Sequence, residues 1–150
     1  TEFYYGEFFK GKTKEEAHRE FFEETLKCVK AFDCFNVLGH LDYIVRYGPY
    51  QDKTVDHAKY QDIIDEIFKT LIKKGKGIEV NTSGYKDLKI CGFPNFEQVQ
   101  RYYDLGGRII TIGTDSHTSD RVGENCLTVT KKYQEIGFED VSTFTGRVKD

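Results

Sequence analysis

The chain contains no methionine and no tryptophan among its 150 residues. It also has no apolar run near the ~18 residues that a membrane-spanning helix needs, and no signal peptide opens it. No Cys-x-x-Cys pair occurs, which argues against a zinc knuckle and a disulfide framework. We therefore expect free thiols in the cytoplasm at all four cysteines: Cys28, Cys34, Cys91 and Cys126. The absence of methionine even at position 1 suggests a piece of a longer polypeptide.

The chain also lacks a large excess of charge of either sign. The formal net charge is -3 with both signs interspersed, so neither nucleic acid nor a membrane surface is expected as the main partner. The length fits one domain with a buried core.

Helical and strand-like segments alternate along the chain. Thr13 and Glu16 form a capping-box pattern, and the helix that follows should turn four apolar residues inward: Ala17, Phe21, Leu26 and Val29. We expect helices over residues 14–31, 54–74, 95–105 and 124–136, and strands over 35–38, 77–80, 108–112 and 141–144. This alternation predicts an α/β fold with a parallel sheet, but does not distinguish a doubly wound sheet from a barrel.

Polar groups follow three of these strands. Residues 108–112, a run typical of a strand buried on both faces, lead into Gly113-Thr114-Asp115-Ser116-His117. Residues 35–38 lead into Gly39-His40-Leu41-Asp42. Residues 77–80 lead into Asn81-Thr82-Ser83-Gly84. Ligands gather beyond the carboxyl ends of parallel strands. Because imidazole and carboxylate bind divalent metals, we predict a shared metal site at this rim.

Simpler interpretations exist for these residues. Asp115 fits a turn cap and His117 a surface residue, but a second strand-end histidine, His40, favours metal. Asp42 fits either a loop-capping carboxylate or a partner that orients an imidazole. Glu79 lies within a strand, so its role is open between metal ligand, substrate contact and paired barrel carboxylate.

The remaining charged candidates lie on loops and helices. His18 and His57 occur among charged residues on predicted helices, and we expect both to be solvated. Arg46 and Lys86 are either ordinary surface cations or, beside a metal rim, groups that hold a phosphate, for which arginine is better suited.

Taken together, the segments 37–44, 79–84 and 105–117, with the continuation 120–123, resemble the histidinol-phosphatase branch of the polymerase-and-histidinol-phosphatase (PHP) superfamily. The resemblance implies a distorted seven-stranded (βα) barrel of the TIM-like kind, with up to three divalent metal ions (zinc, iron or manganese). It further implies a cytoplasmic enzyme of histidine biosynthesis that hydrolyses a small-molecule phosphate ester, L-histidinol phosphate, to L-histidinol and phosphate.

The resemblance also assigns roles. It implies that His40, Asp115 and His117 are metal ligands and the reacting groups of the site. The implied substrate contacts are Arg46, Lys86, Asn81 and Ser83, with lysine at position 86 where the family usually has arginine.

The family's opening His-x-His motif and its middle Glu and His ligands are absent. We therefore expect residues 1–150 to be a single PHP-type fragment, the carboxyl-terminal part of a barrel whose amino-terminal strands lie elsewhere. Such a fragment should be inactive and should self-associate through unpaired strand edges. Two alternatives remain: a non-catalytic PHP-like interaction module and a PHP-type phosphodiesterase or nuclease.

Overall fold

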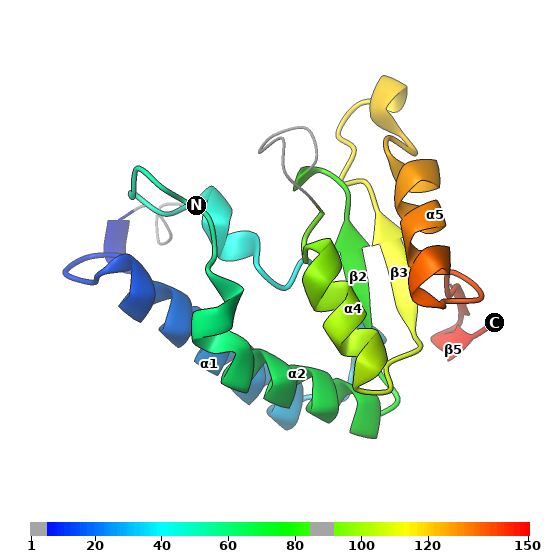
Figure 1. Ribbon diagram of the computed structural model, residues 1–150, viewed down its shortest axis with the longest axis horizontal. Coiled ribbons are helices and arrows are strands. Elements are labelled where there is room, and N and C mark those ends of the chain that lie inside the picture. Colours follow the sequence, from blue (N-terminus) through cyan, green and yellow to red (C-terminus); the bar gives the residue numbers. More distant parts are fainter. Residues whose placement is uncertain (1–5, 85–91) are drawn as a thin grey trace.

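The computed structural model describes residues 6–84 and 92–150. The main helices are α1 (Lys14–Ala31), α2 (Gln61–Lys73), α4 (Phe96–Asp104) and α5 (Cys126–Ile136), and the strands are β1 (Val37–Leu38), β2 (Gly77–Asn81), β3 (Ile110–Gly113), β4 (Phe144–Thr145) and β5 (Val148–Lys149). Three single-turn helices complete the fold: η2 (Tyr43–Arg46), η3 (His57–Tyr60) and η4 (Ser119–Arg121). The α/β alternation is confirmed (Figure 1).

The first three strands form a parallel sheet in the order β1-β2-β3. The strand predicted over 141–144 is wrong in its extent and its partner. It begins only at Phe144 and pairs antiparallel with β5 in a separate two-stranded sheet. Residues 141–143 instead run past β3, where the Ser142 amide donates to the Ile110 carbonyl at 2.8 Å.

One face of the parallel sheet carries the main core. Ile78, Val80 and Ile110 are fully buried and share one cluster with apolar side chains of α2, α4 and α5. In Figure 1, α4 lies in front of β2, and α5 lies beside β3. The expectation that β3 is buried on both faces is wrong, because only Ile110 is fully covered and residues 111–113 are half-buried. β3 is an edge strand of the described sheet, so it lacks a neighbour on one side.

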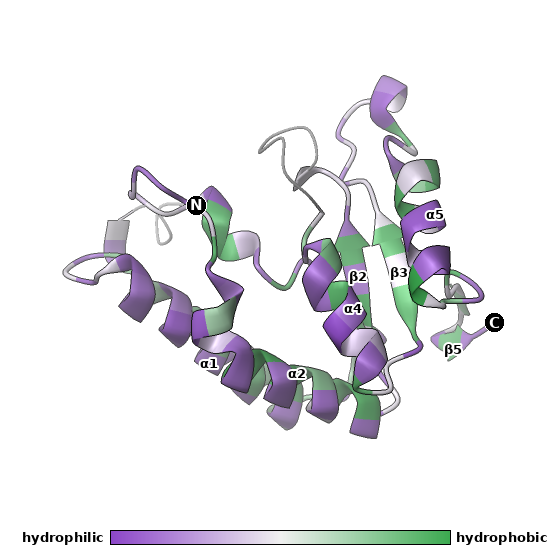
Figure 2. Cartoon of the chain, viewed as in Figure 1, coloured by the Kyte–Doolittle hydropathy of each residue, from purple (hydrophilic) through white to green (hydrophobic). Residues whose placement is uncertain are grey.

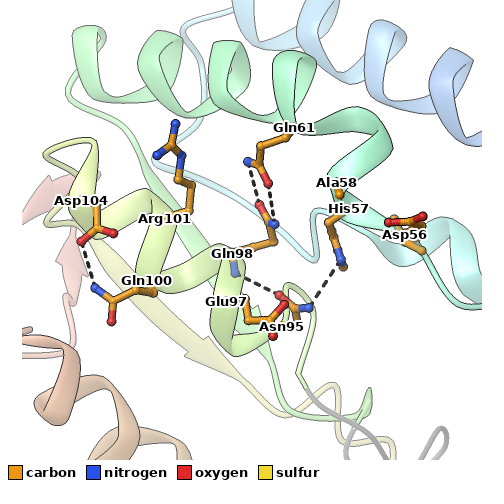
Figure 3. Close-up of a pocket in the computed structure, with 11 residues that line it drawn as sticks. Asp56, His57, Ala58, Gln61, Asn95, Glu97, Gln98, Gln100, Arg101 and Asp104 are labelled. Carbon is orange, nitrogen blue, oxygen red and sulfur yellow. Dashed lines mark hydrogen bonds between the residues drawn. The ribbon is translucent and has the colours of Figure 1, made fainter.

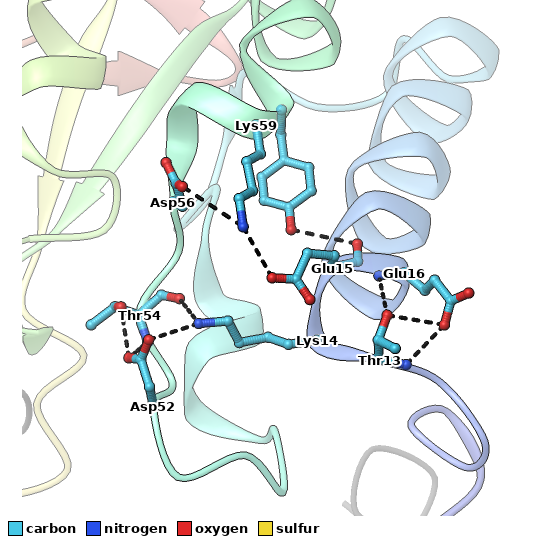
Figure 4. A network of polar contacts seen from close by, with 9 residues as sticks. Thr13, Lys14, Glu15, Glu16, Asp52, Thr54, Asp56 and Lys59 are labelled. Carbon is cyan, nitrogen blue, oxygen red and sulfur yellow. Dashed lines mark hydrogen bonds and ion pairs between the residues drawn. The ribbon is translucent and has the colours of Figure 1, made fainter.

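Helix α1 begins at the predicted capping box. Thr13 accepts from the Glu16 amide, and the Glu16 carboxylate accepts from the Thr13 amide at 2.8 Å. Lys14 forms an ion pair with Asp52 at 2.8 Å, which holds the pKa of that carboxyl below its usual range. Lys59 forms an ion pair with Glu15 at 3.1 Å (Figure 4). These pairs are largely exposed, and such ion pairs contribute little to stability. They mainly set the position of the loop over residues 52–59 against α1.

The buried stripe of α1 includes Ala17 and Val29, as predicted, but between them it is shifted by one residue. Phe22 is fully buried, whereas Phe21 and Leu26 are half-buried. The stripe packs on α2, and the opposite face of both helices is hydrophilic (Figure 2). No helix in the described part of the chain is long and apolar enough to cross a membrane.

The shift places His18 in the core, so the expectation that it is solvated is wrong. The side chain is 1% exposed and lies near the rings of Tyr50 and Tyr60, with centroids 6.5 and 6.0 Å away. Its Nδ1 has no hydrogen-bond partner among the residues described. Burial lowers the pKa of His18 from 6.5 to about 4, because the charged imidazolium loses its hydration. His18 is therefore neutral in the folded protein.

This burial predicts a loss of stability in mild acid. The unfolded chain binds a proton at His18 near pH 6.5, whereas the folded chain does so only near pH 4. The contribution of His18 to the free energy of unfolding is therefore at its maximum above pH 6.5. It decreases as pH drops towards 4 and does not change further below pH 4. The loss should be on the order of 3 kcal/mol. Urea unfolding at several pH values, compared between the natural chain and His18→Phe, measures it; an equally steep decline in the variant would contradict the prediction.

Candidate metal and phosphate site

The three predicted motifs meet at one rim of the sheet. Gly39 and His40 follow β1, Thr82 and Ser83 follow β2, and residues 114–117 follow β3. The Thr82 amide donates to the Gly113 carbonyl at 2.7 Å, which holds the loops after β2 and β3 together. Parallel pairing therefore gathers the candidate residues at the carboxyl ends of the strands, as predicted.

Two candidate ligands have unusual backbone conformations. His40 has φ 31° and Asp115 has φ 51°, a region that few non-glycine residues adopt. The His40 ring also stacks on Tyr43, with centroids 4.3 Å apart. Such conformations persist where surrounding structure imposes them, and they cluster at functional sites. Both loops thus turn sharply as they leave their strands.

The ring of His117 is set for ligation. Its Nδ1 lies 2.8 Å from the carbonyl oxygen of Asp115. Because a carbonyl only accepts, Nδ1 carries the proton and Nε2 keeps its lone pair. Metal-binding histidines are held in the same way by a hydrogen bond to their other nitrogen. Both Asp115 and His117 are exposed, so the lone pair is accessible from the rim.

The side chains do not converge fully. Within residues 6–84 and 92–150, no three His, Cys, Asp or Glu side chains are gathered closely enough to hold a metal ion. The donor types and the His117 tautomer fit a divalent metal such as zinc, but three ligands are fewer than the four that zinc usually takes. Metal ligation by His40, Asp115 and His117 stays a prediction.

The candidate phosphate residues form a connected cluster. Arg46 donates through Nη2 to Ser83 Oγ at 2.5 Å, and Ser83 donates to Asn81 Oδ1 at 2.5 Å. The guanidinium also lies over the rings of Tyr43 and Phe93, 5.0 and 5.6 Å from their centroids. The structure thus brings three of the predicted substrate contacts together, and Tyr43 contacts both Arg46 and the His40 ring. The fourth, Lys86, lies outside the described residues.

The expectation that His57 is solvated is wrong. Its Nε2 lies 3.0 Å from Asp42 Oδ2, and the side chains of His57 and Asp42 are 12% and 5% exposed. On the other side, the Asn95 amide donates to Nδ1 at 3.4 Å, while Asn95 Oδ1 caps α4 by accepting from the Gln98 amide (Figure 3). His57 therefore joins the loop after β1 to the start of α4. Asp42 does orient an imidazole, but one that the sequence pattern did not pair with it.

Two pockets flank His57. An open one of about 490 Å³ lies between η3, the start of α2, and α4, lined mainly by amides and charged groups (Figure 3). Another of about 400 Å³ is lined by Asp42, His57, Val45 and Phe93, among others. None of the predicted metal ligands lines either pocket.

The burial of Asp42 predicts the consequence of removing His57. His57→Ala leaves the carboxylate without its partner, and Asp42 Oδ1 already has none among the described residues. The free energy of unfolding should fall by about 1–3 kcal/mol. Lys59→Ala is the matched control, because it removes only two exposed ion pairs, with Glu15 and Asp56, from the same short helix and should cost below about 1 kcal/mol. Equal urea midpoints for the two variants would contradict this role of His57.

The chain is similar in sequence to known histidinol-phosphatases. Histidinol-phosphatase of Lactococcus lactis is 39% identical over 140 residues, covering 93% of this chain and 52% of that protein. Probable histidinol-phosphatases of Clostridium acetobutylicum (33% over 134 residues, 89% and 52%) and Thermotoga maritima (36% over 126 residues, 83% and 51%) are also similar. The chain spans about half the length of these relatives.

A solved structure matches the fold as well. The crystal structure of histidinol phosphate phosphatase from Lactococcus lactis, complexed with zinc, L-histidinol and phosphate, superposes with a TM-score of 0.85. It is 38% identical, and the match covers 96% of this chain and 54% of that one. The model of the PHP domain matches residues 1–83, more than half of the chain. The chain therefore belongs to the PHP domain family.

Proposed function

We propose that the protein hydrolyses L-histidinol phosphate to L-histidinol and phosphate in a metal-dependent reaction, and that it acts in histidine biosynthesis in the cytoplasm. The observation that carries the proposal is the match to a phosphatase solved with zinc, L-histidinol and phosphate. The rim described above supports the proposal in two ways. The tautomer of His117 is suited to metal ligation, and Arg46, held by Ser83, is suited to binding phosphate.

In this proposal His40, Asp115 and His117 hold divalent metal, with zinc favoured over iron and manganese by the ligand of the related structure. When bound, the metal supplies a Lewis acid and an activated water at neutral pH. We propose that the remaining ligands, for up to three ions, come from the other half of the barrel. That half corresponds to the part of the relatives that this chain does not cover. We accordingly take the described sheet as part of a (βα) barrel of seven strands.

Arg46 is the proposed phosphate clamp. Its planar guanidinium offers parallel donors that match two phosphate oxygens. Ser83 accepts from the guanidinium on one side and in turn donates to Asn81, and Tyr43 and Phe93 flank the guanidinium. The substrate phosphate would thus meet a cation whose orientation is already determined, which lowers the entropic cost of binding. Lys86 is proposed to add a second positive charge, and Asn81 and Ser83 to line the same subsite.

Substitution of a ligand tests the proposal. Asp115→Asn keeps the shape of the side chain but removes its charge, so kcat for L-histidinol phosphate should fall on the order of 100-fold or more, with bound zinc reduced. The assay is phosphate release by the full-length protein with zinc added, and with a chelator. Lys131→Ala, an exposed change on α5, is the control. Full activity of Asp115→Asn, or activity unaffected by the chelator, would contradict the proposal.

The 150-residue polypeptide by itself should behave differently. Three candidate ligands do not complete a zinc site, so we expect little or no phosphate release. β1 pairs only with β2 within the described residues, and an unpaired strand edge favours association. Light scattering should therefore show oligomers. A stable monomer, or robust zinc-dependent hydrolysis, would count against this expectation.

A further inference from the structure

Glu79 is a charged residue in the middle of the central strand. Its neighbours Ile78 and Val80 are fully buried in the helix-covered core. Because side chains alternate along a strand, Glu79 emerges on the opposite face, where it is half-buried. Its register partner there is Thr111 of β3. The acid is therefore placed on the face that the described helices leave open.

The carboxylate of Glu79 lies below the two ligand loops. A Cβ atom added to Gly39 would be 3.2 Å from Oε2, and one added to Gly113 would collide with Oε1. Gly39 directly follows β1, one residue before His40, and Gly113 ends β3, two residues before Asp115. Neither has a positive φ, so space rather than backbone freedom explains them. Two missing side chains make room for one carboxylate between the loops.

No positive charge in the described part of the chain balances this acid. Glu79 makes no hydrogen bond or ion pair with any other described residue. A half-buried carboxylate without donors loses hydration and gains nothing in return. A cation bound at the rim just above would compensate the charge. The position of the Glu79 carboxylate and its lack of a partner among the described residues thus both indicate a bound cation.

We propose that Glu79 is a further acidic group of the metal centre, acting from the floor of the site between His40 and Asp115. The inference rests on the proposed function, because it takes the same metal site as its setting. It assigns Glu79 an electrostatic role in cation affinity. A structural barrel carboxylate would instead stabilise the metal-free fold, and a substrate contact would leave metal affinity unchanged.

The test separates these roles with Glu79→Gln, which preserves size and removes charge. Zinc affinity of the full-length protein is measured by competition with a chromogenic chelator, and stability by urea unfolding of the metal-free form. We expect zinc affinity to fall about 10-fold or more, while metal-free stability is unchanged or higher because an uncompensated charge is gone. Unchanged zinc affinity, or a metal-free protein that is less stable, would overturn the inference.

A second variant changes the space around the Glu79 carboxylate instead of its charge. Gly113→Ala should displace it and weaken zinc binding, yet cause no further loss in a Glu79→Ala background, where the space is open. Gly6→Ala, which meets no atom within 4 Å, is the matched control. Additive losses would contradict the inference.

The outcome also separates this inference from the proposed function. If the natural protein binds zinc through Glu79 but does not hydrolyse L-histidinol phosphate, the proposed activity fails and the inference stands. If hydrolysis requires zinc but the Gln variant binds it normally, only the inference fails.

Discussion

Parallel pairing of three short strands is the constraint on which the site depends. In register, β2 and β3 end together at Asn81 and Gly113, and β1 ends beside β2 at Leu38, opposite Ile78, so loops that are distant in the sequence leave the sheet at one rim. A shift of one residue would turn Glu79 into the apolar core and Val80 out of it. The fully buried Ile78 and Val80 make that shift costly. The core thus sets the positions of the polar groups above it.

Buried polar groups then refine the rim. His57 links Asp42, two residues beyond His40, to the amide that caps α4. Arg46 is held by Ser83 and two aromatic rings in a similar way. The contacts of His57 with Asn95, and of Arg46 with Ser83 and Phe93, join the segment after β1 to the segment that follows β2. The loops are therefore supported by one another as well as by the sheet, as a preorganised site requires.

Most elements could be predicted from the sequence, because local signals specify them. The capping box began α1 where expected, and Asn95 capped α4. The errors lie where a local pattern is ambiguous. His18 was assigned to solvent because its neighbours are charged, but the helical stripe that packs on α2 includes it. Residues 141–143 resemble a strand, yet they run along β3 without joining the sheet.

The sequence by itself determined the order of the elements, the three strand-end motifs and the resemblance to the PHP family, since each depends on residues close together in the chain. Only the tertiary structure decided that His57 pairs with Asp42, that Ser83 holds Arg46, and that Glu79 occupies the space left by Gly39 and Gly113. These contacts join residues many positions apart. Their geometry follows from strand register and helix packing, which no local pattern encodes.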